Sequence, residues 1–242
     1  MTLSYQQENL SYLLNEVAGD ILEQGAVVAP PVNAIELAKG LQIGVIIDSQ
    51  QPTRARHKQI MQQHTIFLKP DDRPERMQWA AAHELGEVFA WRVFEQLNDT
   101  EESRPHSVQR EEVANLLASR ILLPDKHFFL DAIELQFDLI PLKAIYTTAS
   151  YELIAMRLLD EPAQKIVTIC DQGAITRRRS NMKQSLPSMR PLERECWQKG
   201  MQTGKRVTYQ DAGLKVCCFP VHEPHWKREI LLTTPIENED FE

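Results

Sequence analysis

Residues 81–90, AAHELGEVFA, place one histidine and two glutamates at spacings that suit metal chemistry. His83 and Glu87 are four residues apart, so on a helix their side chains share one face. Glu84 is rotated by roughly 100° from that face and can reach a water molecule near the ion. In the zinc-peptidase pattern HExxH a second histidine stands where this chain has Glu87. The stretch therefore predicts two metal ligands, His83 and Glu87, with Glu84 as the general base.

A third ligand has to come from another element. The stretch EEVAN places Glu111 one helical turn before Asn115. If Glu111 binds the ion, Asn115 lies on the same face. Asn115 can then orient a metal ligand through a hydrogen bond without binding the ion itself. A site of one imidazole and two carboxylates is anionic and hard, so it should hold Zn²⁺ with less selectivity against Mn²⁺ or Fe²⁺. Its ligands also donate more charge, which makes a bound water less acidic.

Apolar spacing and helix breakers predict the elements that position these residues. The helix that carries His83 begins at Pro74, and its apolar residues fill more than one face, which is typical of a helix buried on several sides. Ser107 can cap the next helix, which carries Glu111 and ends before Pro124. Further expected elements are a helix over 5–25, a short helix over 34–39 with Asn33 as its N-cap, strands over 43–47 and 64–69, a polar connection over 49–63 and a loop over 97–107.

The C-terminal half changes from helical to strand-like patterns. Residues 126–160 are predicted to be helical with a break at DLIP, and DEPAQ is predicted to be a hinge. Beyond it, KIVTIC, KRVTY, LKVCCFPV and REILLTT are typical of strands, with one helical insert, PLERECWQKGM. The sequence thus predicts an α+β fold with an α-rich N-terminal body and a small α+β C-terminal domain.

Three blocks of the N-terminal half resemble the ImmA/IrrE-type metallopeptidases. They are VVAPPVNAIELAKGLQIGV, ERMQWAAAHELGE and EEVANLLASRILLP, in the family's order and spacing. The resemblance implies a zincin-like fold in which His83 is the first ligand, Glu84 the general base and Glu111 the glutamate ligand. The departure is Glu87, where the family has histidine. The implied domains are a zincin-like peptidase over 1–125, a helical segment over 126–161, a small α+β domain over 162–236 that resembles a GAF-like module, and an acidic tail over 237–242.

The resemblance also implies a function and a partner. The family cleaves DNA-binding transcriptional repressors and thereby switches on genes after DNA damage or in mobile elements. The chain is accordingly expected to be a zinc-dependent endopeptidase with a repressor as its protein substrate. Because Glu87 replaces a histidine, the alternative is a catalytically inactive regulator that keeps the zincin fold and uses its groove to hold a partner.

Four other features have a functional interpretation beside a simpler structural one. His64 could be a substitute ligand or a transition-state donor, or an exposed histidine beside a strand. Residues 137–160 resemble a helix-turn-helix, or form a helical bundle with few basic residues. ITRRRSNMK could contact phosphate or an acidic partner, or be a solvated loop. CCFPVHEPH could bind zinc, or place buried cysteines on a strand before two exposed histidines.

Composition and charge restrict the remaining classes of function and the cellular location. The formal net charge of −7 argues against nucleic-acid binding through bulk charge. The N-terminus lacks the basic and apolar regions of a signal peptide, and no apolar run reaches the length of a bilayer span. The four cysteines lie in the C-terminal third, two of them adjacent, which is not a disulfide framework. A reduced, cytoplasmic setting is therefore expected.

Overall fold

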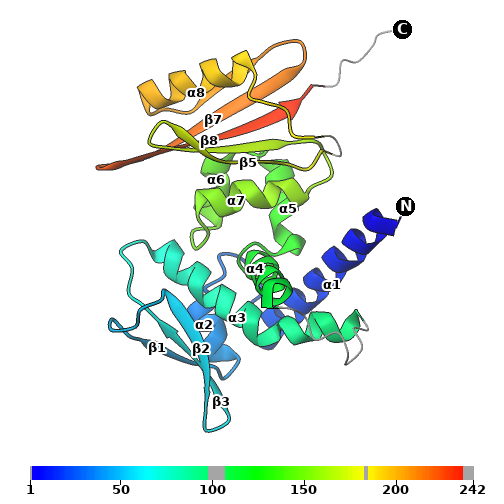
Figure 1. The fold of residues 1–242 in the computed structure, drawn as a ribbon, viewed down its shortest axis with the longest axis vertical. Helices are drawn as coiled ribbons and strands as arrows, with labels where there is room; N and C mark the ends of the chain where they lie inside the picture. Colours follow the sequence, from blue (N-terminus) through cyan, green and yellow to red (C-terminus); the bar gives the residue numbers. More distant parts are fainter. Residues whose placement is uncertain (1, 98–106, 183–184, 237–242) are drawn as a thin grey trace. The chain divides into compact units, whose positions relative to one another are not determined.

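The computed structural model describes residues 2–97, 107–182 and 185–236, and the predicted α+β class is confirmed (Figure 1). The chain divides into two compact units. Unit 1 comprises residues 1–131 and 143–150, and unit 2 comprises residues 132–142 and 151–242. The predicted helical segment 126–161 is thus shared between the units, and the predicted domain boundaries stay a prediction. No described helix is long and apolar enough to cross a membrane.

Unit 1 is built around two packed helices, α3 (Pro74–Gln96) and α4 (Ser107–Leu122). The long α1 (Thr2–Gln24) packs on both, and the short α2 (Ala34–Gly40) packs on α3. Pro74 begins α3 as predicted, and the Asn33 side chain caps α2 by accepting from the N–H groups of Ile35 and Glu36. Buried positions of α3 include Ala81, Leu85 and Ala90, so α3 is the central helix that its apolar pattern predicts.

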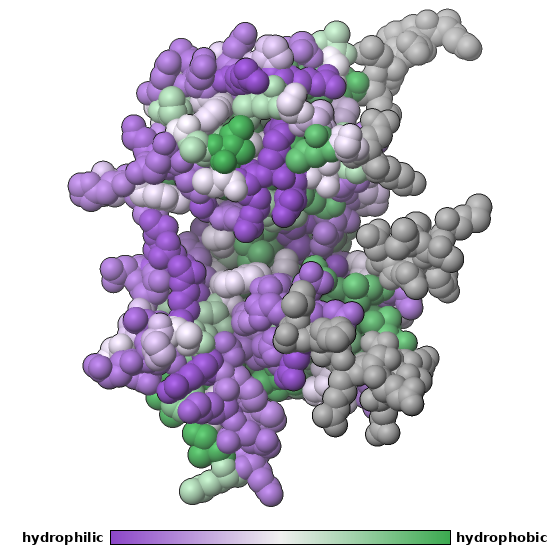
Figure 2. Space-filling model, in the orientation of Figure 1, coloured by the Kyte–Doolittle hydropathy of each residue, from purple (hydrophilic) through white to green (hydrophobic). Residues whose placement is uncertain are grey.

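A three-stranded sheet in the order β1-β3-β2 completes unit 1. Its strands are β1 (Gly44–Ile47), β2 (Ala55–Ile60) and β3 (Gln63–Leu68). β1 pairs with β3 in parallel and β2 pairs with β3 antiparallel. The predicted polar connection over 49–63 is wrong in its second half, because ARHKQI forms the edge strand β2. Ile60 and Met61 are exposed at the β2–β3 turn, and apolar colour shows at this end of the sheet in Figure 2.

Short helices occupy the middle of the chain. They are α5 (Asp125–Glu134), α6 (Leu139–Ile145), α7 (Tyr151–Arg157) and the 3-10 helix η1 (Leu158–Asp160). The break between α5 and α6 covers residues 135–138, where Gln136 and Phe137 have positive φ, so it lies just before the predicted position at DLIP, whose last three residues begin α6. A second break over 146–150, which the sequence pattern did not indicate, separates α6 from α7. The helix-turn-helix interpretation of this segment stays a prediction.

Unit 2 contains a five-stranded antiparallel sheet in the order β5-β4-β8-β7-β6. The strands are β4 (Ile166–Asp171), β5 (Ala174–Ser180), β6 (Val207–Gln210), β7 (Leu214–Glu223) and β8 (Trp226–Pro235). The helix α8 (Pro191–Thr203) packs on β6, β7 and β8. Four of these strands and α8 were predicted. β5 was expected to be a solvated loop, and that expectation is wrong.

The basic and cysteine-rich stretches of unit 2 have structural partners. Arg177 pairs with Glu152 at 2.9 Å, and Arg178 forms two 3.0 Å hydrogen bonds to the buried Glu193. All four cysteines are buried and free, and burial raises the pKa of Cys196 to about 11. His222 contacts the buried Glu229 at 2.7 Å. In the described part of unit 2 these residues form no metal-binding group, so the zinc interpretation of CCFPVHEPH is not supported. Lys183, residues 98–106 of the predicted loop and the acidic tail lie outside the described residues.

Candidate metal centre

The two central helices of unit 1 bring His83, Glu87 and Glu111 together. His83 and Glu87 project from α3, and Glu111 projects from α4. Each offers one ligand atom, and these atoms lie within 4.8 Å of one another. His83 Nε2 is 3.6 Å from Glu111 Oε1. Within residues 2–97, 107–182 and 185–236 no other cluster of three such side chains forms.

Asn115 orients the imidazole of His83. Its Oδ1 lies 3.2 Å from His83 Nδ1, and its Nδ2 donates to Glu111 Oε1 at 3.4 Å. With Oδ1 as acceptor, Nδ1 carries the proton and Nε2 keeps its lone pair on the side of Glu111. One amide therefore fixes both the tautomer of His83 and the orientation of the Glu111 carboxylate. Residues that form hydrogen bonds to metal ligands usually act in this way.

Arg110 anchors Glu87. Its Nε lies 2.9 Å from Glu87 Oε2, and its Nη2 donates to the Glu87 backbone carbonyl at 3.1 Å. The contact joins α4 to α3 at the ligand that departs from the HExxH pattern. Sequence analysis missed Arg110, because nothing in the one-dimensional pattern indicates which charged residue of α4 faces Glu87.

Glu84 lies beside the cluster and is buried, with 8% of its surface exposed. Burial is the main cause that raises the pKa of Glu84, and the charges of Glu87 and Glu111 raise this pKa further. A hydrogen bond from the His57 backbone and the His83 charge act in the opposite direction on the same pKa. A carboxylate whose pKa is raised in this way is a stronger base than an ordinary glutamate, which suits it to accept a proton.

Gly86 permits the close approach of the two helices. A Cβ at this position would lie 2.4 Å from the Ala114 carbonyl oxygen and 2.9 Å from Ala114 Cα. Both distances are far below normal van der Waals contact, so no larger residue fits without moving the backbone. Gly86 thus sets the helix spacing that brings Glu111 to His83.

The residues present fit a divalent metal ion. Zinc ligands at about 2.0–2.2 Å in a tetrahedral arrangement are roughly 3.3–3.6 Å apart, which matches the separation of His83 Nε2 and Glu111 Oε1. One imidazole and two carboxylates are donors that zinc, manganese and iron accept. Three protein ligands also leave a position for substrate or water, as catalytic rather than structural zinc sites do.

His64 is not a member of the cluster. It lies on β3 and stacks on His57 of β2, with ring centroids 4.7 Å apart and His57 Nε2 2.6 Å from His64 Nδ1. Burial, then the charges of His64 and Arg110, lower the pKa of His57. Each imidazole therefore has the other as partner, and the substitute-ligand interpretation of His64 has no support in the geometry.

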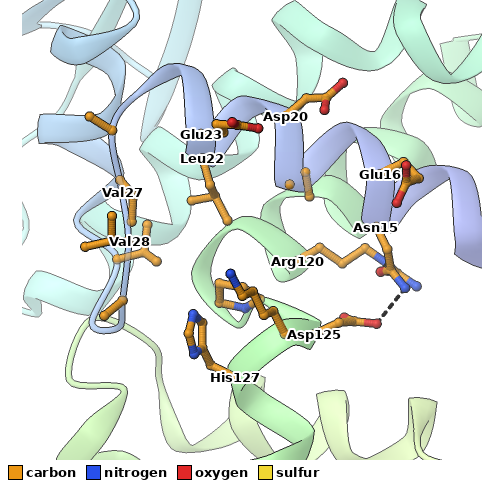
Figure 3. A pocket seen from close by; sticks show the side chains of 17 residues that line it. Asn15, Glu16, Asp20, Leu22, Glu23, Val27, Val28, Arg120, Asp125 and His127 are labelled. Carbon is orange, nitrogen blue, oxygen red and sulfur yellow. Dashed lines mark hydrogen bonds between the residues drawn. The ribbon is translucent and has the colours of Figure 1, made fainter.

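A cavity of about 550 Å³ lies elsewhere in unit 1 (Figure 3). Side chains of α1, of the 26–32 loop and of the start of α5 line it, and Asn15 Nδ2 donates to Asp125 Oδ2 at 2.5 Å on its wall. Arg120 also lines it and donates to Asn15 Oδ1 at 2.8 Å. None of the cluster residues contributes to this cavity.

Comparison with known proteins gives this arrangement a family. The family model of the IrrE N-terminal-like domain, Peptidase_M78, matches residues 38–159, which include the whole cluster. The match spans half of the chain, and the chain therefore belongs to this family of metallopeptidase-related regulators, whose members are typically metal-dependent. The resemblance drawn from the three sequence blocks is confirmed.

A solved structure has a similar fold. It is a Mycobacterium tuberculosis transcriptional regulator, 18% identical to this chain, with a TM-score of 0.68. The alignment covers 92% of this chain and 75% of that chain. At this level of identity the likeness shows the fold alone. Among curated proteins no sequence matches significantly.

Proposed function

We propose that this protein is a metal-dependent endopeptidase of the ImmA/IrrE type. The observation that carries the proposal is the meeting of His83, Glu87 and Glu111 beside the buried Glu84. The proposal assigns metal binding to His83, Glu87 and Glu111. Asn115 orients His83 and Glu111, and Glu84 is the catalytic base. Zn²⁺ is the proposed metal, with Mn²⁺ or Fe²⁺ as alternatives because two of the three donors are carboxylates.

The proposed chemistry assigns a task to each residue. A divalent ion held by the three ligands would supply a Lewis acid that polarises a peptide carbonyl and acidifies a water molecule. Glu84 accepts the proton of that water, because its raised pKa makes the carboxylate a better base, and then delivers the proton to the leaving amine. Asn115 keeps His83 in the tautomer whose Nε2 is unprotonated and can bind the ion.

The proposed substrate is a DNA-binding transcriptional repressor in the cytoplasm, cleaved in a stress or mobile-element response. Family membership supports a regulatory protein partner. The net charge of −7 favours a protein partner over direct DNA binding. Co-expression with candidate repressors, followed by detection of their fragments, tests this part of the proposal.

Metal content tests the site itself. Protein purified without chelators should carry about one equivalent of metal by plasma mass spectrometry, and His83→Ala should carry far less, because the imidazole is the best zinc ligand of the three. Lys39→Ala, on the exposed face of α2, is the control and should keep its metal. Equal and negligible metal in wild type and His83→Ala would end the enzyme proposal.

The alternative is an inactive zincin-fold regulator, and Glu87 is the observation that favours it. Glu87→His separates the two functions, because it restores the HExxH ligand pattern. If wild type neither binds metal nor cleaves and Glu87→His does both, the natural protein is a degenerate peptidase. If the substitution leaves existing activity equal or weaker, Glu87 is a true ligand.

A further inference from the structure

Arg110 is the charged residue of the site that neither the ligand set nor the proton transfer uses. We propose that Arg110 is a positioning residue for Glu87, and that the Glu87–Arg110 pair together replaces a neutral ligand at position 87. The proposal rests on the proposed metal-binding function and adds to it the feature that lets a carboxylate serve there.

The first argument is geometric. Arg110 Nε lies 2.9 Å from Glu87 Oε2 in an ion pair, and Nη2 donates to the backbone carbonyl of the same residue at 3.1 Å. One planar guanidinium thus contacts both the carboxylate and the backbone carbonyl of Glu87. A glutamate loses considerable rotamer freedom when it is ordered, and this double contact imposes that order before an ion binds. A carboxylate has about four lone-pair sites, so the ion pair with Arg110 is compatible with a bond to metal.

The second argument is charge. With His83 neutral, the ligands Glu87 and Glu111 carry a formal charge of −2, and the +1 of Arg110 brings the group to −1. Two histidines and one glutamate would also carry −1. With Glu87 in place of a histidine, Arg110 therefore returns the formal charge of the site to −1. It also offsets the like-charge repulsion between the two carboxylates.

The third argument is the place of Arg110 in the fold. It directly precedes Glu111, so α4 delivers the third ligand and the partner of the second ligand from adjacent positions. Its side chain is 54% exposed and that of Glu87 is 23% exposed, which puts the pair at the rim of the cluster. An isolated surface pair of this exposure contributes little to stability. Its effect should therefore appear in metal binding rather than in folding.

Zinc affinity of the chelator-stripped full-length chain tests the proposal. Competition titrations would compare wild type, Arg110→Gln, Arg110→Lys, Glu87→His and the Glu87→His/Arg110→Gln double variant. Arg110→Gln should bind Zn²⁺ about 10- to 100-fold more weakly, the range typical for losing a partner of a metal ligand. Arg110→Lys, which keeps the charge without the double contact, should recover only part of that loss.

The double variant gives the specific signature. With histidine at position 87 the carboxylate is gone and the guanidinium only repels the cation, so Arg110→Gln should then leave affinity unchanged or raise it. Arg76→Gln is the matched control, because it removes an equal charge from an exposed ion pair of unit 1, the pair with Asp71. It should change zinc affinity by less than about 3-fold, since exposed charges are well screened.

Three results would overturn the positioning role. They are equal affinities of wild type and Arg110→Gln, tighter binding by Arg110→Gln, and the same loss in both backgrounds at position 87. Failure of the proposed function looks different. If wild type binds zinc with the expected dependence on Arg110 but cleaves no protein, the peptidase proposal fails while the positioning role stands. If no variant with Glu87 binds zinc, both fail.

Discussion

At the scale of single residues, Glu84 has the environment that best suits proton transfer. It is buried, it directly follows the proposed ligand His83, and two further carboxylates lie near it. We expect Glu84→Gln to keep metal binding, because Glu84 is not among the three ligands. Cleavage should fall by about 10²- to 10⁴-fold, the usual contribution of a general base. Parallel measurement of metal content and fragment formation checks this, and loss of metal from Glu84→Gln would contradict the assignment.

The same residue gives a prediction for stability against pH in chelator-treated protein. Because burial raises the pKa of Glu84 in the folded state, ionisation of this carboxyl disfavours folding. The penalty is absent below the unfolded-state pKa, grows as pH rises through it, and is complete above the raised folded-state pKa. Glu84→Gln should therefore gain stability relative to wild type between about pH 4 and about pH 7. Urea unfolding at both pH values measures the change, and a constant difference would show that Glu84 does not titrate abnormally.

At the scale of elements, the site depends on how closely α3 approaches α4. Gly86→Ala puts a methyl group 2.4 Å from a backbone oxygen of α4, so the helices have to separate. We expect a loss of about 1–3 kcal/mol in stability and weaker zinc binding, since Glu111 moves away from His83. Gly19→Ala in α1 is the control, because its Cβ would meet nothing within 4 Å and alanine favours helix by up to about 1 kcal/mol. Equal behaviour of the two variants would exclude the close-packing role of Gly86.

Elements with strong local signals could be predicted from the sequence. Pro74 and Asn33 mark helix starts through their own backbone and side-chain chemistry, and the apolar pattern of α3 indicates a buried helix. β2 and β5 could not be predicted, because their sequences, ARHKQI and AITRRRS, are polar at the sheet edges. Pairing with β3 and β4 creates these strands, and the partner of Arg178, Glu193, lies 15 residues away.

The candidate site likewise contains features that the sequence could predict and features that it could not. Helical spacing pairs His83 with Glu87 and Glu111 with Asn115, and the family resemblance implied that the two pairs belong to one site. The Arg110–Glu87 contact and the His57–His64 stack depend on how α3, α4 and the β2–β3 pair pack. Such contacts are set by tertiary structure and leave no periodic signal in one sequence.

At the scale of the whole molecule, each compact unit has its own core and its own polar network. The candidate metal cluster of His83, Glu87 and Glu111 belongs to unit 1 alone. In unit 2 a core around the cysteines packs α8 on the sheet, and the Arg228 guanidinium joins Asp171 of β4 to Glu152 of α7. A change in this ion network should consequently alter the stability of unit 2 without altering metal binding.

Asp171→Asn makes that expectation measurable. Hydrogen bonds from Arg228, at 2.6 and 2.9 Å, are the main cause that lowers the pKa of Asp171. A lowered pKa means that the carboxylate stabilises the fold above its unfolded-state pKa and that this contribution is lost as pH falls through the folded-state value. The variant should be less stable than wild type by about 1–2 kcal/mol at pH 7, and the difference should shrink as pH falls below about 4, the ordinary pKa of an aspartate.

Fluorescence-detected unfolding can follow this change, because Trp197 and Trp226 belong to unit 2 and Trp79 and Trp91 to unit 1. The zinc affinity of Asp171→Asn should equal that of wild type, since the Arg228 network belongs to unit 2 and the candidate cluster to unit 1. A fall in zinc affinity as large as that expected for Gly86→Ala would mean that the folding of unit 2 and the metal centre are energetically coupled. The assignment of the centre to unit 1 alone would then be wrong.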